Sequence, residues 1–381
     1  MPLSLQRGHL YKKNALVSGM AAFNRNTPYN KLPALPPKAE LETSAILKKA
    51  IKANRALAKL TGSSKQLPNQ SMLINSIGLR EAKLSSEIEN IVTTNDELYQ
   101  AFSSDKIVTD AATKEVLHYQ DALWHGYNFV KEKEFLSTNL FITIFNIIKE
   151  TNAGVRKTTG TKILNAKTGE VIYTPPEGEE IIRQKLKNLE DYINDPDDDT
   201  DPLIKMAVMH YQFEAIHPFA DGNGRTGRIL NILYLVMNNL LEMPVLYLSK
   251  YIIEHKSNYY KGLNEVTENQ KWESWILYML DAIEHTAGYT QQKINSIVAL
   301  MKETETLVKQ KAPDIYSKEL IEVIFRQPYC KRKFLEEAGI VKKKTAGIYL
   351  SRLEEIGLMK SVKAGKEKLF IHQQLFDILK K

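Results

Sequence analysis

HPFADGNGRTGR, residues 217–228, is the stretch on which the fold of this 381-residue chain depends. Just upstream, Asp201-Pro202 combines a helix N-cap with a proline at the first helical position, which predicts a helix over LIKMAVMHYQFEAI. His217-Pro218 should end that helix, because the proline ring restricts the residue before it. The following TGRILNILYLVMNNL is apolar almost all round and longer than a typical strand, which predicts a buried helix. We therefore expect a glycine-rich loop between two helices.

This loop has the composition of an anion-binding site. The free amides at the start of the second helix, together with the helix dipole, favour negative charge. Arg225 and Arg228 lie on one face of that helix and can donate forked hydrogen bonds to phosphate oxygens. The alternative is a structural turn with surface arginines. Such a turn needs neither His217 and Asp221 together nor paired arginines.

The same residues resemble a known family signature. HPFADGNGR is similar at every position to the Fic family pattern His-x-Phe-x-Asp/Glu-Gly-Asn-Gly/Lys-Arg, and TGR extends the similarity to the second arginine. Fic proteins typically transfer AMP from ATP to a hydroxyl side chain of a target protein. The resemblance therefore implies a Fic-type helical core, ATP as substrate and a protein as acceptor.

The resemblance also implies a chemical role for each motif residue. His217, with an expected pKa near neutrality, would be the general base for the acceptor hydroxyl. Asp221 would hold Mg²⁺ against the α- and β-phosphates. Arg225 and Arg228 would offset charge on the β- and γ-phosphates. Close approach of the phosphates would be permitted by the remaining motif residues, Gly222, Asn223, Gly224, Thr226 and Gly227.

A second pattern lies far upstream, at Ser85-Ser86-Glu87-Ile88-Glu89-Asn90. It resembles the Fic-associated pattern Ser/Thr-x-x-x-Glu-Gly/Asn, which begins at Ser85 and ends at Asn90. In the family this pattern belongs to an inhibitory helix, here expected at about 85–100. Its glutamate, Glu89, would pair with Arg228 and block the γ-phosphate position. The alternative is a capping box, in which Ser86 and Glu89 close a helix N-terminus.

Two further segments fit the same family. VRKTTGTKILNAKTGEVIYTPP, residues 155–176, predicts a β-hairpin that turns around residues 165–169. The resemblance implies a flap that covers the active site and pairs its edge with the target; an ordinary surface hairpin is the alternative. SKYIIEHKSNYYKGL, residues 249–263, resembles the segment that carries an aromatic residue of the adenine pocket. Tyr260 is the first candidate and Tyr259 the second, with core packing as the alternative.

The C-terminal part has a different pattern. DAIEHTAGYTQQKINSIVALMKETETLVKQK, residues 281–311, predicts a long amphipathic helix, which is a connector or a dimer surface. From Pro313 a helix, a turn and a helix ending at Leu358 precede a two-strand hairpin with Ala364-Gly365-Lys366 at its tip, the order of a winged helix. Lys342–Lys344 would contact DNA phosphates. A protein-docking or dimerising module is the alternative, because Glu354 and Glu355 lie on the supposed recognition helix.

We expect a mainly α chain of several parts. These are an N-terminal helical region (1–105), a catalytic domain with the flap (106–285), a connecting helix (286–312) and a winged-helix-like domain (313–381). One cysteine and no apolar core of a signal peptide indicate a cytoplasmic protein. The sequence contains no run of eighteen apolar residues, so it predicts no membrane span. The net charge of +7 is a weak signal for nucleic acid, and a homodimer is expected.

Three functions follow. The first is a protein adenylyltransferase that modifies Ser, Thr or Tyr hydroxyls of targets, or of itself, and is restrained by Glu89. The second is another Fic chemistry, with a different nucleotide donor or with removal of AMP. The Gly-Asn-Gly-Arg turn favours a triphosphate donor over the phosphotransferase branch, which usually carries lysine in place of the second glycine. The third is a DNA-binding regulator that uses the C-terminal domain.

Overall fold

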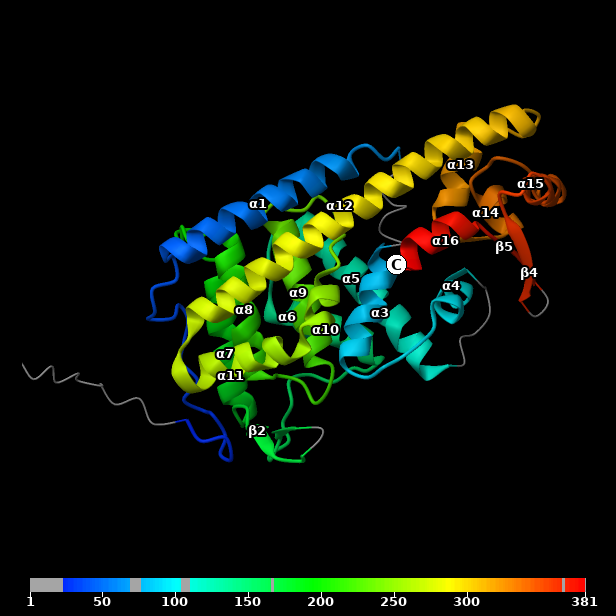
Figure 1. Cartoon of the computed structure of the whole chain (residues 1–381). Helices are drawn as coiled ribbons and strands as arrows, with labels where there is room; N and C mark the ends of the chain where they lie inside the picture. Colours follow the sequence, from blue (N-terminus) through cyan, green and yellow to red (C-terminus); the bar gives the residue numbers. More distant parts are fainter. Residues whose placement is uncertain (1–22, 69–76, 104–109, 166–167, 365–366, 381) are drawn as a thin grey trace, which may run out of the picture.

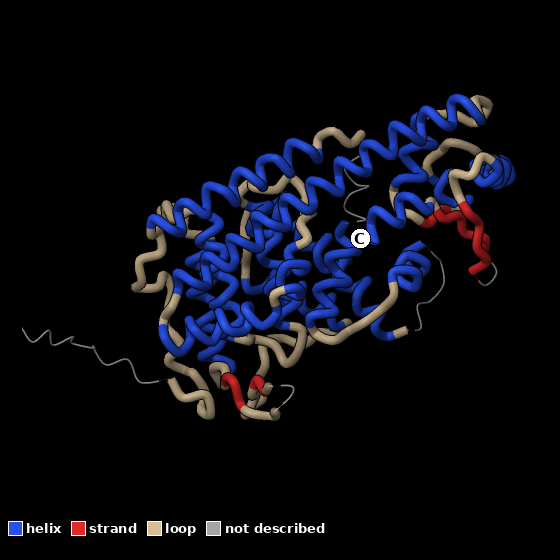
Figure 2. The backbone as a smooth tube through the Cα atoms, in the orientation of Figure 1, coloured by secondary structure: helices blue, strands red, loops and turns tan. Residues whose placement is uncertain are grey.

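Residues 23–68, 77–103, 110–165, 168–364 and 367–380 are described by the computed structural model. Most of them are helical, and strands occur in two places, a short hairpin and a small C-terminal sheet (Figure 2). The mainly α fold that the sequence predicts is thus confirmed. Within these described ranges no helix is both long and apolar enough to span a membrane.

Two buried helices, α8 (Pro202–Ile216) and α9 (Asn223–Met237), flank the motif loop and form the centre of the helical core. Asp201 caps α8 by accepting a hydrogen bond of 2.8 Å from the Leu203 amide, and Pro202 occupies the first turn as predicted. The helix ends at His217, whose φ is 49°. Gly222, with φ 74°, precedes α9 directly. The sequence therefore identified the loop between two helices correctly.

Several further helices belong to the same helical core. They are α5 (Ala111–Lys133), α6 (Thr138–Lys149), α7 (Glu179–Ile193), α10 (Leu248–Glu254) and α11 (Lys256–Asn269). Helix α5 lies against both α6 and α9, and α7 lies against α8. Gly126 of α5 allows the closest approach, since a Cβ there would lie 2.4 Å from a methyl group of Leu233 on α9.

The predicted hairpin is present and short. Strands β1 (Ile163–Leu164) and β2 (Val171–Tyr173) pair antiparallel, with Ile163 opposite Tyr173 and an irregularity in the register. The chain reverses between Asn165 and Gly169, whose amide donates to the Asn165 carbonyl at 2.8 Å. Residues 166–167 of the predicted turn lie outside the described residues.

The predicted helix over residues 85–100 is wrong. Helix α3 (Leu79–Ile88) ends just before Glu89, and Asn90 follows with φ 63°, a left-handed conformation that stops a helix. The next helix, α4 (Asn95–Ser103), starts only after a short loop. The alternative capping box fails as well, because Ser86 lies inside α3 and not at its start.

A true capping box begins α4 instead. The Glu97 amide donates to Thr94 Oγ1 at 3.1 Å, and the Thr94 amide donates to Glu97 Oε2 at 3.0 Å. This reciprocal pair fixes the start of α4. Glu89 therefore lies at the junction of two helices, and its side chain is not used to close a helix N-terminus.

Helix α12 (Trp272–Lys311) runs the length of the molecule. It begins earlier than the predicted helix over 281–311, and the expected domain boundary at residue 285 falls inside it. Helix α1 (Ser44–Ser64) lies alongside its first half (Figure 1), where Lys49 pairs with Asp281 and, at 2.6 Å, with Glu284. The face expected as a dimer surface is thus covered there by α1.

Beyond α12 the chain forms a small C-terminal domain. Its elements are α13 (Lys318–Phe325), β3 (Tyr329–Cys330), α14 (Arg332–Glu337), α15 (Lys343–Glu355), β4 (Lys360–Ala364), β5 (Glu367–Ile371) and α16 (Gln373–Lys380). The strands form an antiparallel sheet in the order β3-β5-β4. Residues 365 and 366 of the predicted hairpin tip lie outside the described residues. The domain packs back on α4 and α12, close to the helical core (Figure 1).

Candidate active site

The motif loop is closed from inside by Asn223. Its side-chain carbonyl accepts from the Phe219 amide at 2.9 Å, and its side-chain amide donates to the Phe219 carbonyl at 2.8 Å. Phe219 is fully buried and stacks on Phe145 of α6 with ring centroids 4.2 Å apart. Asn223, 2% exposed, therefore shapes the loop with its side chain, and only its backbone amide is left to meet a ligand at the start of α9.

His217 lies at the end of α8 with its backbone held from outside the motif. Its carbonyl accepts from Arg156 Nε at 2.8 Å, and the Arg156 amide donates to the Pro218 carbonyl at 2.9 Å. Burial lowers the pKa of the imidazole to about 4, and the positive charge of Arg156 acts in the same direction. The expected pKa near neutrality is therefore wrong. At neutral pH the ring is unprotonated and can accept a proton.

Asp221 carries the one carboxylate of the motif loop, with 67% of its side chain accessible. It lies 2.8 Å from Lys149 Nζ, and its other oxygen accepts from the Gly222 amide at 2.7 Å. Burial alone would raise its pKa, but the hydrogen bonds from Lys149 and Gly222 outweigh this effect and hold the pKa below its ordinary value. The group is an ionised, accessible carboxylate.

A single carboxylate of this kind suits Mg²⁺, which binds proteins through one or two carboxylates and completes its shell with phosphate oxygens and water. Over the described residues no group of three or more His, Cys, Asp or Glu side chains could hold a metal by itself. Asp221 is therefore fitted to share a cation with a phosphate ligand.

Arg225 is buried and has a carboxylate partner that the sequence did not reveal. Its Nη1 lies 2.6 Å from Glu115 Oε1 of α5, and only 1% of the arginine side chain is exposed. Glu115 also pairs with Lys149 at 2.6 Å, which in turn contacts Asp221. These four groups form one alternating charge network across α5, α6 and the motif. No spacing within the chain could have indicated it, because the members come from separate helices.

Arg228 is held by the upstream pattern. Its Nε donates to Ser85 Oγ at 2.7 Å, and its Nη2 donates to the Ser85 carbonyl at 2.9 Å. The same Nη2 lies 2.8 Å from Glu89 Oε1, with 1% of the arginine and 35% of the glutamate side chain exposed. Burial opposes the charge on Arg228, yet Glu89 raises its pKa above the ordinary value. Three residues predicted from two distant patterns thus meet in the structure.

Two further carboxyl groups that the sequence does not reveal lie near Arg228, those of the buried Glu81 and the partly buried Glu214. Burial raises the pKa of Glu81 and of Glu214 to about 7, and the charge of Arg228 lowers both only in part. Glu81 accepts hydrogen bonds from Ser249 at the start of α10. Glu214 lies beside Gly227, where an added Cβ would be 2.6 Å from its Oε1. Gly227 is therefore required for the close packing of α8 against α9.

The two tyrosines proposed for the adenine pocket have different environments. Tyr259 is 2% exposed, and its hydroxyl lies 2.8 Å from His210 Nε2, so it packs in the core. Tyr260 is 42% exposed and meets the Tyr259 ring edge to face at 5.3 Å. The core-packing alternative applies to Tyr259, while Tyr260 presents a ring that a ligand can reach.

Comparisons of the sequence with known families match three parts of the chain. The Fic/DOC family N-terminal domain matches residues 47–128, and the Fic/DOC family matches residues 135–235. The C-terminal domain of protein adenylyltransferase SoFic-like matches residues 300–375. Both sequence patterns that meet at Arg228 lie inside the matched ranges.

Individual proteins show similarity over shorter stretches. Protein adenylyltransferase fic-1 of Caenorhabditis elegans is 37% identical over 90 residues, which cover 23% of this chain and only 16% of that relative. A probable protein adenylyltransferase of Aquifex aeolicus is 50% identical over 52 residues, 14% of this chain and 16% of the relative. The crystal structure of a Fic family protein from Desulfovibrio desulfuricans G20 covers 88% of this chain and 98% of its own, with a TM-score of 0.53 and 16% identity. This last similarity concerns the fold.

Proposed function

We propose that this chain, which carries two Fic/DOC family domains and a SoFic-like C-terminal domain, is a protein adenylyltransferase. It transfers AMP from ATP to a Ser, Thr or Tyr hydroxyl of a target protein, or of itself. The observation that carries the proposal is the motif loop. An unprotonated His217, an accessible Asp221 and the free amides at the start of α9 all belong to it.

The reaction follows from these groups. His217 takes the proton of the acceptor hydroxyl, and the hydroxyl oxygen forms a bond to the α-phosphorus. The bond from that phosphorus to the oxygen bridging to the β-phosphate breaks, and pyrophosphate leaves. The pKa of about 4 describes the imidazole without nucleotide. The negative charge of bound ATP favours the imidazolium and makes His217 a stronger base when the substrate is present.

The remaining residues bind and orient the nucleotide. Asp221 would hold Mg²⁺, which would supply charge neutralisation at the phosphates when bound. The backbone of Gly222, Asn223 and Gly224 approaches the phosphates closely, and Tyr260 stacks on the adenine ring. Thr226 lies one turn further, with its hydroxyl donating to the Gly222 carbonyl at 2.9 Å, so it supports the loop.

Glu89 restrains this activity by occupying Arg228. The guanidinium that would hold the γ-phosphate already has a carboxylate partner at 2.8 Å, and Ser85 fixes its orientation at 2.7 Å. The γ-phosphate and the carboxylate compete for the same donor, so ATP binds productively only when Glu89 moves away.

Mass spectrometry of the Glu89→Gly protein incubated with ATP and cell lysate tests the reaction and the acceptor together. We expect an AMP adduct on the protein itself or on a lysate protein, and no adduct when His217→Ala is added. Parallel reactions with labelled ATP, UTP and GTP identify the donor, and a pre-modified target tests for removal of AMP. Adducts that persist at the same level after His217→Ala would refute the proposed base.

A second candidate function rests on the C-terminal domain. Lys342, Lys343 and Lys344 are exposed at the N-terminus of α15. Glu354 accepts a hydrogen bond from the Ser361 amide of β4 at 2.8 Å, so its carboxylate contacts the β4–β5 hairpin. We interpret the domain as a winged helix that contacts DNA phosphates. Binding that weakens with salt and is lost when the three lysines are neutralised supports this role; no binding at low salt refutes it and leaves protein docking.

A further inference from the structure

Arg156 lies where the hairpin joins the active-site loop. It precedes β1, yet only 5% of it is exposed. Its Nε donates to the His217 carbonyl at 2.8 Å, and its Nη2 donates to the Pro176 carbonyl just after β2. Its backbone amide donates to the Pro218 carbonyl at 2.9 Å. One residue therefore ties both ends of the hairpin to the turn that carries His217.

A second contact holds the hairpin at the same place. Tyr173, the last residue of β2, is 7% exposed, and its hydroxyl donates to the Ala215 carbonyl of α8 at 2.8 Å. Ala215 and His217 belong to the same helix end. The position of β2 relative to the imidazole is thus set by two separate side chains, of which only Arg156 carries a charge.

That charge also acts on the imidazole. Besides burial, three charged groups affect the pKa of His217: Arg156 lowers it, while Glu89 and Asp221 raise it, as does the backbone of Glu214. Loss of the guanidinium charge would therefore raise the pKa of His217. Loss of the hydrogen bonds alone, with the charge retained, would not.

We propose that Arg156 is a positioning residue of the AMP-transfer site, whose forked hydrogen bonds fix the hairpin over His217 and whose charge acts on the imidazole. That Arg156 affects AMP transfer rests on the proposed function. Its two physical effects can be separated, because Arg156→Gln removes the charge and the fork, whereas Arg156→Lys keeps the charge and removes the fork.

The test is an NMR titration of the His217 imidazole combined with hydrogen exchange of the β1 and β2 amides. We expect Arg156→Gln to raise the pKa of His217 and Arg156→Lys to leave that pKa unchanged. Both variants should accelerate amide exchange in the hairpin. Tyr173→Phe is the uncharged comparison and should accelerate exchange without moving the pKa. An unchanged titration with Gln, or unchanged exchange in both Arg156 variants, overturns the proposal. Neither readout requires AMP transfer, so failure of the proposed function would remain distinguishable.

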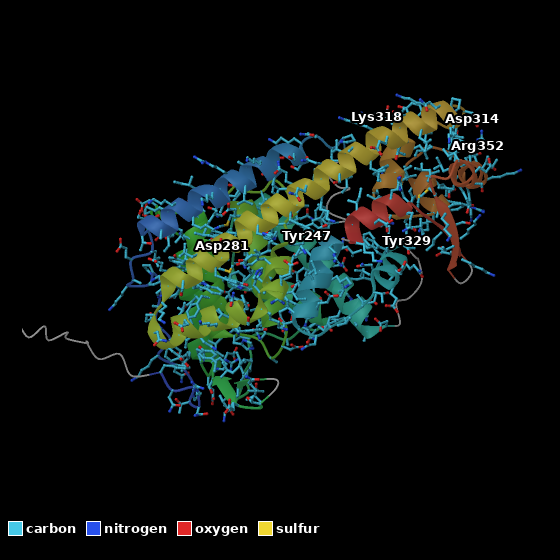
Figure 3. The ribbon with its side chains drawn as sticks, in the orientation of Figure 1. Tyr247, Asp281, Asp314, Lys318, Tyr329 and Arg352 are labelled. Carbon is cyan, nitrogen blue, oxygen red and sulfur yellow. The ribbon has the colours of Figure 1, made fainter. Side chains whose placement is uncertain are left out.

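A second, independent inference comes from the packing of the C-terminal domain. Tyr99 of α4 stacks on Tyr329 of β3 with centroids 6.3 Å apart and meets Phe376 of α16 edge to face at 5.9 Å. The Tyr329 hydroxyl donates to Asp96 at the start of α4. Figure 3 shows Tyr329 in the region where α16 and α4 approach each other. At the end of α4, Ser103 accepts from Gln327 at 3.1 Å.

Helix α3 is held to the same domain. Arg80 donates to the Lys380 carbonyl at the end of α16 at 3.1 Å, and to Asn95 Oδ1 at the start of α4, also at 3.1 Å. Glu89 lies in the short connection between α3 and α4. Both helices that flank the inhibitory carboxylate therefore contact the C-terminal domain.

We infer that the C-terminal domain controls the inhibition: docked on α3 and α4, it keeps Glu89 on Arg228, and loss of this docking releases the active site. The inference rests on the proposed function. In energetic terms the docking contact and the Glu89–Arg228 pair are coupled sites, and the effect of one depends on the presence of the other.

The experiment measures AMP transfer by Phe376→Ala and Tyr329→Phe, each in the Glu89 and the Glu89→Gly backgrounds. The exposed Ile348→Ala on α15 is the control within the same domain. We expect the two interface variants to raise the rate of the Glu89 protein toward that of Glu89→Gly, with no further rise in the Gly background. Equal changes in both backgrounds, or no change in either, overturns the coupling. If Glu89→Gly itself transfers no AMP, the proposed function fails, and hydrogen exchange of residues 86–94 in Phe376→Ala still decides the coupling.

Discussion

Replacing Glu89 by glycine should raise the affinity for ATP far more than the affinity for ADP. The substitution removes the carboxylate that lies 2.8 Å from Arg228 Nη2 and leaves the hydrogen bonds that the same guanidinium donates to Ser85. Glu89 is the C-cap residue of α3, with φ −91° and ψ 14°, a position where glycine is accommodated without disrupting the helix.

The size of the effect follows from the geometry of the pair. A hydrogen bond between charged groups contributes about 1.5–3 kcal/mol. Arg228 is 1% exposed but the Glu89 side chain is 35% exposed, which places this pair in the lower half of that range. A contribution of about 2 kcal/mol corresponds to roughly a 25-fold gain in ATP affinity. ADP has no γ-phosphate to compete with Glu89, so its gain should be much smaller.

Isothermal titration calorimetry with ATP and with ADP measures both affinities. The matched control is Glu87→Gln, because Glu87 lies two residues before Glu89, in the last turn of α3, but pairs with Lys83. The control should bind both nucleotides as the unmodified protein does. Equal gains for ATP and ADP, or no gain for ATP in a folded Glu89→Gly protein, would refute competition for Arg228.

Three further predictions concern stability. Glu115→Gln removes the negative charge that lies 2.6 Å from the buried Arg225 and should lower the free energy of unfolding by about 3 kcal/mol, near the lower end for a broken buried pair because Glu115 is 22% exposed. Lys149→Gln should lower it less, and an equal loss in thermal denaturation would contradict the assignment. Burial raises the pKa of Glu81 from 4.5 to about 7, so between these pH values the folded state binds more protons than the unfolded state, and stability falls as the pH rises through them. Glu81→Gln should remove this fall, which amounts to at most about 3 kcal/mol of unfolding free energy, in thermal melts from pH 5 to 8. Gly227→Ala places a methyl group 2.6 Å from Glu214 Oε1 and 3.1 Å from the Phe213 ring and should cost about 1–3 kcal/mol, whereas Gly288→Ala, with open space around it, should not destabilise; similar melting temperatures for the two variants would show that the α8–α9 contact can relax.

The parts of the fold that sequence reasoning predicted are those with strong local signals. Asp201-Pro202 determines the start of α8, and the apolar run after Arg228 determines that α9 is a buried helix. The meeting of Arg228 with Glu89 was predicted only through the resemblance. It could not follow from periodicity, because the two residues come from helices joined by tertiary packing.

The errors have local and non-local causes. The helix over 85–100 was predicted although Asn90, which commonly adopts the left-handed conformation, and Thr94 with Glu97 three residues on are stop and start signals. The ordinary value for histidine predicts a pKa near neutrality for His217, whereas burial, which the sequence does not show, lowers it to about 4. Arg156 was missed because its partners are backbone carbonyls distant in sequence.

The length of helix α12 determines how the C-terminal domain is rotated relative to the helical core. The helix passes from the core into the C-terminal domain over 40 residues without interruption. Each residue inserted into it would turn everything beyond by about 100° and move it by about 1.5 Å. A single insertion would thus swing β3 and α16 away from α4, and an insertion of about seven residues would restore the direction but leave a gap of roughly 10 Å. The contact between the C-terminal domain and α4 therefore constrains the length of α12 as strictly as it constrains the residues at the contact itself.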